Sequence, residues 1–186
     1  MPDKSIAKKY FKILNSKIIP DEKVFGNMIK IKDLIVKVKK NKSRVLIFGN
    51  GGSAAIASHV SVDLTKNVKV KAMNFNEADL ITCFSNDYGY EKWIEKTIEF
   101  YADKKDILIL ISSSGKSKNM VNACKAAKRK KVSKIITLTG NKKNNPLSKL
   151  GDINLWVDSN IYNHIENIHQ IWLLAICDLI KLNKVK

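Results

Sequence analysis

The fold of this chain is decided by one stretch, VLIFGNGGSAAIASHVSVDL at residues 45–64, which predicts a strand, a glycine turn and a helix. The apolar run at 45–48 is typical of a strand that is buried on both faces. Three glycines within residues 49–52 permit a sharp turn, and Ser53 is the expected helix N-cap. Because a helix begins here, we expect backbone N–H groups and the Asn50 and Ser53 side chains to face an anionic ligand. The alternative is a tight turn that binds nothing.

Outward from this stretch, apolar runs and helical spacing alternate along the chain. We expect further strands at 70–75, 106–111, 134–139 and 153–157, a turn at 144–146, and helices at 79–86, 91–101, 119–131 and 161–182. Two helices, within 6–15 and 20–35, precede the first strand. This alternation predicts a three-layer α/β/α fold whose five-stranded parallel sheet is covered on both faces. We expect one domain, with N-terminal helices in 1–42 and an α/β core in 43–186.

A serine-rich loop follows the strand at 106–111 directly. It contains Ser112, Ser113, Ser114 and Ser117, with Lys116 either adding charge or facing solvent. Ligands of open parallel sheets bind beyond the carboxyl ends of the strands, and small hydroxyls there suit a phosphate group. Neither GxxxxGK[ST] nor GxGxxG occurs, which argues against a nucleoside triphosphate or a dinucleotide.

Two polar pairs lie at helical spacing. His59 and Asp63 are at positions i and i+4, and Glu166 and His169 are at positions i and i+3. If the four groups converge, they form a mixed oxygen and nitrogen set that can bind a divalent metal or move protons. Otherwise each pair is an ordinary polar pair on a helix surface, and the spacing alone leaves both interpretations open.

The composition restricts the partners of the chain. Its 186 residues carry a formal charge of +17, but 34 basic residues include only two arginines, and the lysines are dispersed. Reading of base edges favours arginine, so we expect steering of a phosphorylated substrate rather than a nucleic-acid function. No apolar run approaches the roughly 20 residues of a membrane span, and the polar start is unlike a signal peptide. Three widely spaced cysteines suggest reduced thiols and a cytoplasmic location.

Five motifs together resemble a known family. GNGGSA at 49–54, SxHxxxDL within 58–64, SNDYGYE at 85–91, ISSSGKS at 111–117 and ITLTG at 136–140 are similar to the phosphoheptose isomerases of the sugar isomerase (SIS) domain superfamily. The resemblance implies a parallel sheet between helices and a homotetramer with active sites between subunits. It also implies conversion of sedoheptulose 7-phosphate to an aldoheptose phosphate for surface polysaccharide, including lipopolysaccharide.

The resemblance implies roles for individual residues. The phosphate cradle would comprise Ser112, Ser113, Ser114 and Ser117, and the sugar contacts Asn50, Gly51, Gly52, Asn86 and Asp87. His59 matches a zinc-ligand position. Three positions depart from the family pattern: Asp63 replaces the catalytic glutamate, Glu166 replaces a glutamine, and Leu174 replaces the histidine that is both catalytic and metal-binding. Leucine cannot bind a metal, so the implied zinc site is incomplete, and His169 is the nearest available imidazole.

Three hypotheses follow for the function. In the first, the chain is a sugar-phosphate isomerase in which Glu166 or Asp63 is the base and His59, with or without a metal, polarises the carbonyl. In the second, it is a non-catalytic SIS module that binds a sugar phosphate or a protein partner. In the third, it is an isomerase with a changed phosphorylated sugar. The helix at 161–182 is apolar on nearly all sides, as expected of a core helix or of an interface in a homotetramer.

Overall fold

Five parallel strands form the centre of the computed structural model, which describes residues 2–182. They are β1 (Arg44–Gly49), β2 (Lys71–Met73), β3 (Ile107–Ser112), β4 (Lys134–Thr139) and β5 (Ile153–Trp156), in the order β2-β1-β3-β4-β5. The register pairs Gly49 with Ile111 and Ser112 with Thr139, so β1, β3 and β4 end at the same edge of the sheet. The predicted five-stranded parallel sheet is confirmed.

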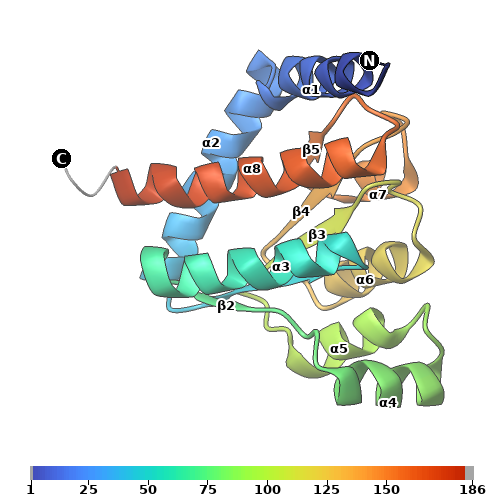
Figure 1. The fold of residues 1–186 in the computed structure, drawn as a ribbon. Helices are drawn as coiled ribbons and strands as arrows, with labels where there is room; N and C mark the ends of the chain where they lie inside the picture. The colour runs from blue at the N-terminus through green and yellow to red at the C-terminus, as the bar shows by residue number, and fades with distance from the viewer. Residues whose placement is uncertain (1, 183–186) are drawn as a thin grey trace.

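Helices cover both faces of the sheet (Figure 1). One face carries α2 (Glu22–Lys40), α3 (Gly52–Asp63) with the π-helical turn η1 (Leu64–Val68), and α8 (Tyr162–Leu182). The other carries α4 (Ala78–Tyr88), α5 (Trp93–Tyr101), α6 (Lys118–Arg129) and the short α7 (Pro146–Leu150). Alternate residues of each strand face opposite layers: Ile107, Ile109 and Ile111 of β3 belong to the first core, and Leu108 and Leu110 to the second. Among residues 2–182, no helix is long and apolar enough to cross a membrane.

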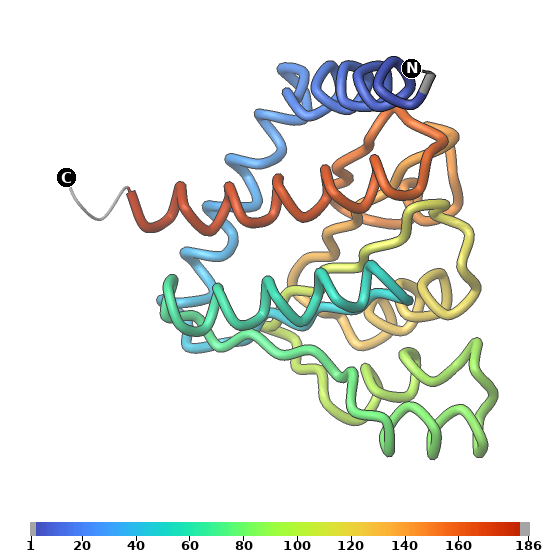
Figure 2. The backbone as a smooth tube through the Cα atoms, in the orientation of Figure 1, coloured from blue at the N-terminus to red at the C-terminus, as the bar shows by residue number. Residues whose placement is uncertain are grey.

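The two N-terminal helices pack against different parts of the molecule. The α2 helix, capped by the Asp21 carboxylate, lies along the edge strand β5, where Asn27 Nδ2 donates to the Asn154 carbonyl at 3.1 Å. The α1 helix (Pro2–Ile18) is held at its end by Trp172 of α8, whose indole N–H donates to the Ile18 carbonyl at 2.8 Å. In Figures 1 and 2, α1 lies at one border of the molecule beside the start of α8.

Three local predictions need correction. The α3 helix begins at Gly52 with Gly51 as N-cap at a φ of 53°, so Ser53 lies in the first turn and is not the cap. Only glycine adopts this backbone conformation without strain. Strand β2 is shorter than expected, because Asn74 turns away and donates to Ser61 Oγ at 2.8 Å. The expected turn at 144–146 instead opens α7, since Asn145 forms a capping box with Ser148.

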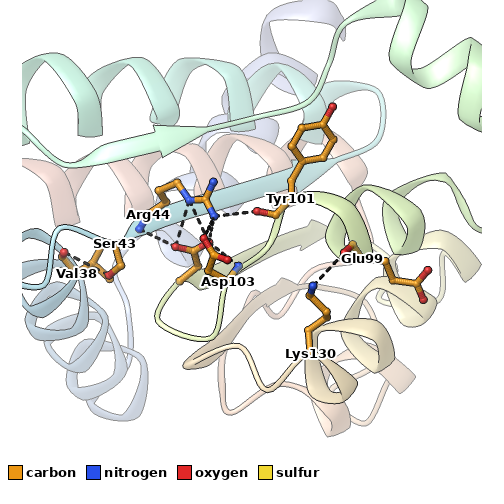
Figure 3. A network of polar contacts seen from close by, with 8 residues as sticks. Val38, Ser43, Arg44, Glu99, Tyr101, Asp103 and Lys130 are labelled. Atoms are coloured by element: carbon orange, nitrogen blue, oxygen red, sulfur yellow. Dashed lines mark hydrogen bonds and ion pairs between the residues drawn. The ribbon is translucent and has the colours of Figure 1, made fainter.

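A polar network connects the starts of β1 and β3, at the edge of the sheet opposite the one where the strands end (Figure 3). Asp106, 1% exposed, accepts hydrogen bonds from the Arg44 backbone N–H and guanidinium and from the Asp103 N–H. Arg44 also donates to the Tyr101 carbonyl at 2.8 Å. A buried carboxylate is tolerated only when it is paired and hydrogen-bonded, and this network fixes the starts of β1 and β3 relative to each other.

Candidate functional site

A small cavity of about 120 Å³ opens where β1 and β3 end. It brings together side chains that lie far apart in the sequence. They are Asn50, Ser53, Ile111, Ser112, Ser113, Ser114, Ser117, Tyr162 and Glu166. All except Ile111 and Tyr162 were singled out from the sequence. The cavity lies between the beginnings of α3 and α6 and the beginning of α8, at the edge where ligands of parallel sheets bind.

The serine loop supplies most of the polar wall of this cavity. Ser113 Oγ is buried and has no hydrogen-bond partner among the described residues, whereas Ser112 Oγ and Ser117 Oγ lie 3.3 Å apart. Gly115 has a φ of 63°, and a Cβ there would overlap the Asn145 side chain. A buried hydroxyl without a partner costs about 1–3 kcal/mol, so the Ser113 hydroxyl is positioned for a group that the chain itself does not provide.

The glycine turn forms the facing wall. The backbone N–H groups of Ser53 and Ala54 donate to the carbonyls of Asn50 and Gly51, at 3.0 and 2.9 Å. These two donors are therefore used within the turn and are not free, contrary to the sequence-based expectation. The Glu166 carboxylate lies against Gly52, so closely that a Cβ at this glycine would overlap it. A carboxylate is favoured there by the positive end of α3.

Asn50 is held by a network that the sequence did not reveal. Its side-chain amide donates to Asn119 Oδ1 at 3.0 Å, and its Oδ1 accepts from Asn119 Nδ2 at 2.9 Å and from the Tyr90 hydroxyl at 3.3 Å. The Met120 backbone N–H donates to Asn119 Oδ1 at 3.0 Å, which identifies that atom as the oxygen. Since Asn119 is fixed in this way, the orientation of the Asn50 amide is fixed as well.

The helices α3 and α8 lie side by side and carry the remaining polar candidates (Figures 1 and 2). His59 Nδ1 is 3.1 Å from Gln170 Nε2, a contact that joins the two helices beyond the cavity. Asp63, one turn farther along α3, accepts from Asn67 Nδ2 at 3.1 Å. Gln170 was missed because the sequence alone does not reveal which face of α8 meets α3.

His169 is not on the exposed surface that carries His59. Its ring is buried, and Nε2 lies 3.2 Å from the Thr139 carbonyl. Burial lowers the pKa of His169 to about 4, only partly opposed by the hydrogen bond to Thr139. The ring is therefore neutral at pH 7. Its Nδ1 has no partner within the part of the chain that the structure describes.

The donor set does not fit a metal ion. Within residues 2–182, no group of three or more His, Cys, Asp or Glu side chains is arranged to hold one. The His169 ring is buried against the Thr139 carbonyl, and Leu174 packs against the apolar core of its sheet face. A zinc site requires about four nitrogen, oxygen or sulfur ligands at close range, and these residues do not provide it within one chain.

Asn86 and Asp87 also lie apart from the cavity. They occupy the last turn of α4, are exposed, and bond to each other at 3.0 Å. Neither lines the cavity that contains the serine loop.

Comparisons with known proteins agree with this architecture. The sequence model of the SIS domain family matches residues 16–140. A phosphoheptose isomerase of Aliarcobacter butzleri is 37% identical over 157 residues, covering 81% of this chain and 82% of that protein. One from Buchnera aphidicola of Schizaphis graminum is 32% identical and covers 94% and 100%. The structure of a Neisseria gonorrhoeae phosphoheptose isomerase superposes with a TM-score of 0.87 at 26% identity, covering 97% and 99%.

Proposed function

The chain belongs to the phosphoheptose isomerase family of SIS-domain proteins, and from this membership we propose that it interconverts sedoheptulose 7-phosphate and an aldoheptose phosphate. The product would serve heptose synthesis for surface polysaccharide. The relatives carry the names of isomerases, which favours an enzyme over a non-catalytic binding module.

The unpaired hydroxyl of Ser113 is the observation that carries this proposal. It lines a cavity of about 120 Å³ together with four other serines, and this volume can hold a phosphate group. A phosphate oxygen would accept the hydrogen bond that the Ser113 hydroxyl lacks. Ser112, Ser114 and Ser117 would complete the cradle, and Asn50 with Gly51 and Gly52 would contact the sugar.

Glu166 is the proposed base, because its carboxylate lies against Gly52, a proposed sugar contact, whereas Asp63 does not line the cavity. Its carboxylate would take a proton from C1 of the ketose while the electron pair forms the C1–C2 double bond and the C2 oxygen gains a proton. Return of a proton to C2, with loss of the O1 proton, gives the aldehyde. His59, held by Gln170, would stabilise the charge that develops on the carbonyl oxygen. No step uses a metal.

The proposed assembly is a homotetramer with sites between subunits. Large apolar side chains are exposed on α1, directly after it and at the start of α8, including Ile6 and Phe11 at 65%, Ile19 at 72% and Tyr162 at 57%. Exposed apolar side chains on elements that pack together are typical of an interface. Asn86 and Asp87, which lie apart from the cavity of their own chain, would then contribute to the site of a neighbouring subunit. A monomer in light scattering would contradict this assembly. The three free cysteines suit the proposed cytoplasmic location.

The function is tested by incubating the protein with sedoheptulose 7-phosphate in deuterated water. We expect NMR to show aldoheptose phosphate and deuterium at the carbon that gains the proton. Ser113→Ala should raise KM about tenfold yet leave the thermal stability unchanged or higher, because the unpaired buried hydroxyl is removed. Ser133→Ala, at an exposed position, is the matched control.

Binding of the substrate without exchange or product would contradict the isomerase function. Deuterium incorporation into another phosphorylated sugar, and none into sedoheptulose 7-phosphate, would instead support the hypothesis of a changed substrate.

A further inference from the structure

A wide cleft lies at the edge of the sheet where the strands begin, opposite the cavity lined by the serine loop (the serine cavity). It encloses about 820 Å³ and gathers a high density of basic residues. The lining residues are Asn41, Lys42, Ser43, Arg44, Lys71, Ala102, Asp103, Lys104, Lys105, Asp106, Arg129 and Lys130. Seven of these are cationic and two are anionic, and the two arginines of the whole chain are both among them.

Both arginines and Lys130 already have partners. Arg44 binds Asp103 at 2.6 Å and Asp106 at 2.7 Å, which occupies the two carboxylates of the cleft. Arg129 binds Glu95 and Glu99 of α5, and Lys130 donates to the Glu99 carbonyl at 3.0 Å (Figure 3). These contacts tie the end of α5, the end of α6 and the start of β1 together, so the walls of the cleft are fixed.

Four lysines at the same cleft have no such partner. Lys42, Lys71, Lys104 and Lys105 are exposed, and among residues 2–182 none of them makes an ion pair or a side-chain hydrogen bond. Carbonyls at the nearby helix ends already have other donors. Near the end of α2 the carbonyls of Lys37, Val38 and Lys39 accept backbone N–H groups, and the Tyr101 carbonyl at the end of α5 accepts from Arg44. Four like charges on one cleft repel one another, and a bound anion would remove this cost.

We propose that this cleft binds a small molecule with two or more linked phosphoryl groups. Lysine ammonium groups are compact point charges that suit phosphate, and a cleft lined by one sign of charge concentrates an anion of opposite sign. The cleft has the volume of a small-molecule site, about seven times that of the serine cavity. No aromatic side chain lines it, so it offers no surface on which a nucleobase would stack.

The experiment uses inorganic tripolyphosphate as the probe and the full-length protein in isothermal titration calorimetry at low salt. We expect one site per chain that remains available when saturating orthophosphate fills the serine cavity. Combining Lys71→Gln, Lys104→Gln and Lys105→Gln should weaken tripolyphosphate at least tenfold. The matched control combines Lys12→Gln, Lys125→Gln and Lys181→Gln, which removes the same charge from exposed positions outside the cleft, and should change the affinity less than twofold.

Equal weakening in both triple variants would overturn the proposal, because net charge and not the cleft would then explain binding. Competition by orthophosphate, together with weakening by Ser113→Ala, would also overturn it by assigning the probe to the serine cavity. A single-stranded oligonucleotide that displaces tripolyphosphate and binds more tightly would replace the small molecule with a nucleic acid. If the triple variant unfolds, the three single substitutions, each expected to weaken binding at least twofold, apply the same test.

Discussion

Asn50 and Asn119 lie 69 residues apart in the sequence and exchange two hydrogen bonds, of 3.0 and 2.9 Å, at the rim of the serine cavity. The exchange uses one amide hydrogen of Asn50 and leaves the second for a ligand. Asn119 is 3% exposed and is oriented by the Met120 backbone N–H, so it determines which atom of the Asn50 amide donates and which accepts. Asn119 is therefore a positioning residue for a proposed sugar contact.

Asn119→Asp tests this role. The substitution keeps size and shape but removes the donor to Asn50 Oδ1, so the Asn50 amide loses its fixed orientation. We expect kcat/KM for the sugar phosphate to fall about 10- to 100-fold, which corresponds to roughly 1.4–2.7 kcal/mol. Affinity for inorganic phosphate should change less than twofold. Asn122→Asp on the same helix is the control, since the one side-chain hydrogen bond of Asn122 within residues 2–182 goes to the Glu91 carbonyl. Equal loss of phosphate and sugar binding would point to a purely structural role.

Glu166→Gln separates binding from proton transfer. Glutamine preserves the volume of the side chain but cannot accept the proton, so turnover should fall about 10²- to 10⁴-fold. Binding of the sugar phosphate should hold or improve, because a negative charge leaves the phosphate cavity. Both effects are measured by steady-state kinetics and calorimetry. Asp63→Asn is the comparison and should retain most of the activity. The opposite pattern, with Asp63→Asn inactive and Glu166→Gln active, would transfer the role of base to Asp63.

Gly52→Ala probes the contact between α3 and the Glu166 carboxylate. Alanine favours a helix, yet its Cβ would overlap Glu166 and displace it. Because the displaced atoms are the end of a flexible side chain, we expect Gly52→Ala to change the free energy of unfolding by about 1 kcal/mol or less in urea titrations. The kcat for the sugar phosphate should fall by about 10-fold or more, because the carboxylate of the proposed base moves out of position. Unchanged turnover in Gly52→Ala would show that the two residues do not interact as described.

Burial of His169 predicts that stability falls in acid. Its pKa is about 4 in the folded protein against 6.5 ordinarily, so the unfolded chain binds more protons between these values. The free energy of unfolding should therefore drop as the pH falls below 6.5, by about 2 kcal/mol from this residue between pH 7 and 5. Urea titrations of His169→Gln should show a flatter pH dependence. An unaltered slope in His169→Gln would contradict the assignment.

The two arginines differ in what they neutralise. Arg44→Met leaves the buried Asp106 carboxylate without its guanidinium partner, and we expect a loss of about 3–5 kcal/mol in the free energy of unfolding. Arg129→Met removes exposed ion pairs with Glu95 and Glu99 and should cost about 1 kcal/mol or less. Chemical denaturation of both variants tests this contrast, and similar losses would show that the Asp106 network is not a main support of the sheet edge.

Much of the fold is predictable from local patterns. The apolar runs of β1, β3 and β4 were recognised because a strand buried on both faces needs apolar side chains at every position. Six of the cavity residues, Asn50, Ser53, Ser112 to Ser114 and Ser117, were identified because loops after parallel strands meet at one edge. The shorter β2 and the extra α7 were not predicted, since both depend on side-chain hydrogen bonds of Asn74 and Asn145.

The sequence by itself determined which segments are strands, that the chain turns sharply at residues 49–52 and which loops carry small polar side chains, because these features depend on periodicity and on the conformational freedom of glycine. Only the tertiary structure decided that Asn119 orients Asn50, that Glu166 lies against Gly52, and that His169 faces Thr139 and not His59. These relationships depend on how helices rotate and pack on the sheet, and packing joins residues whose separation along the chain carries no local signal.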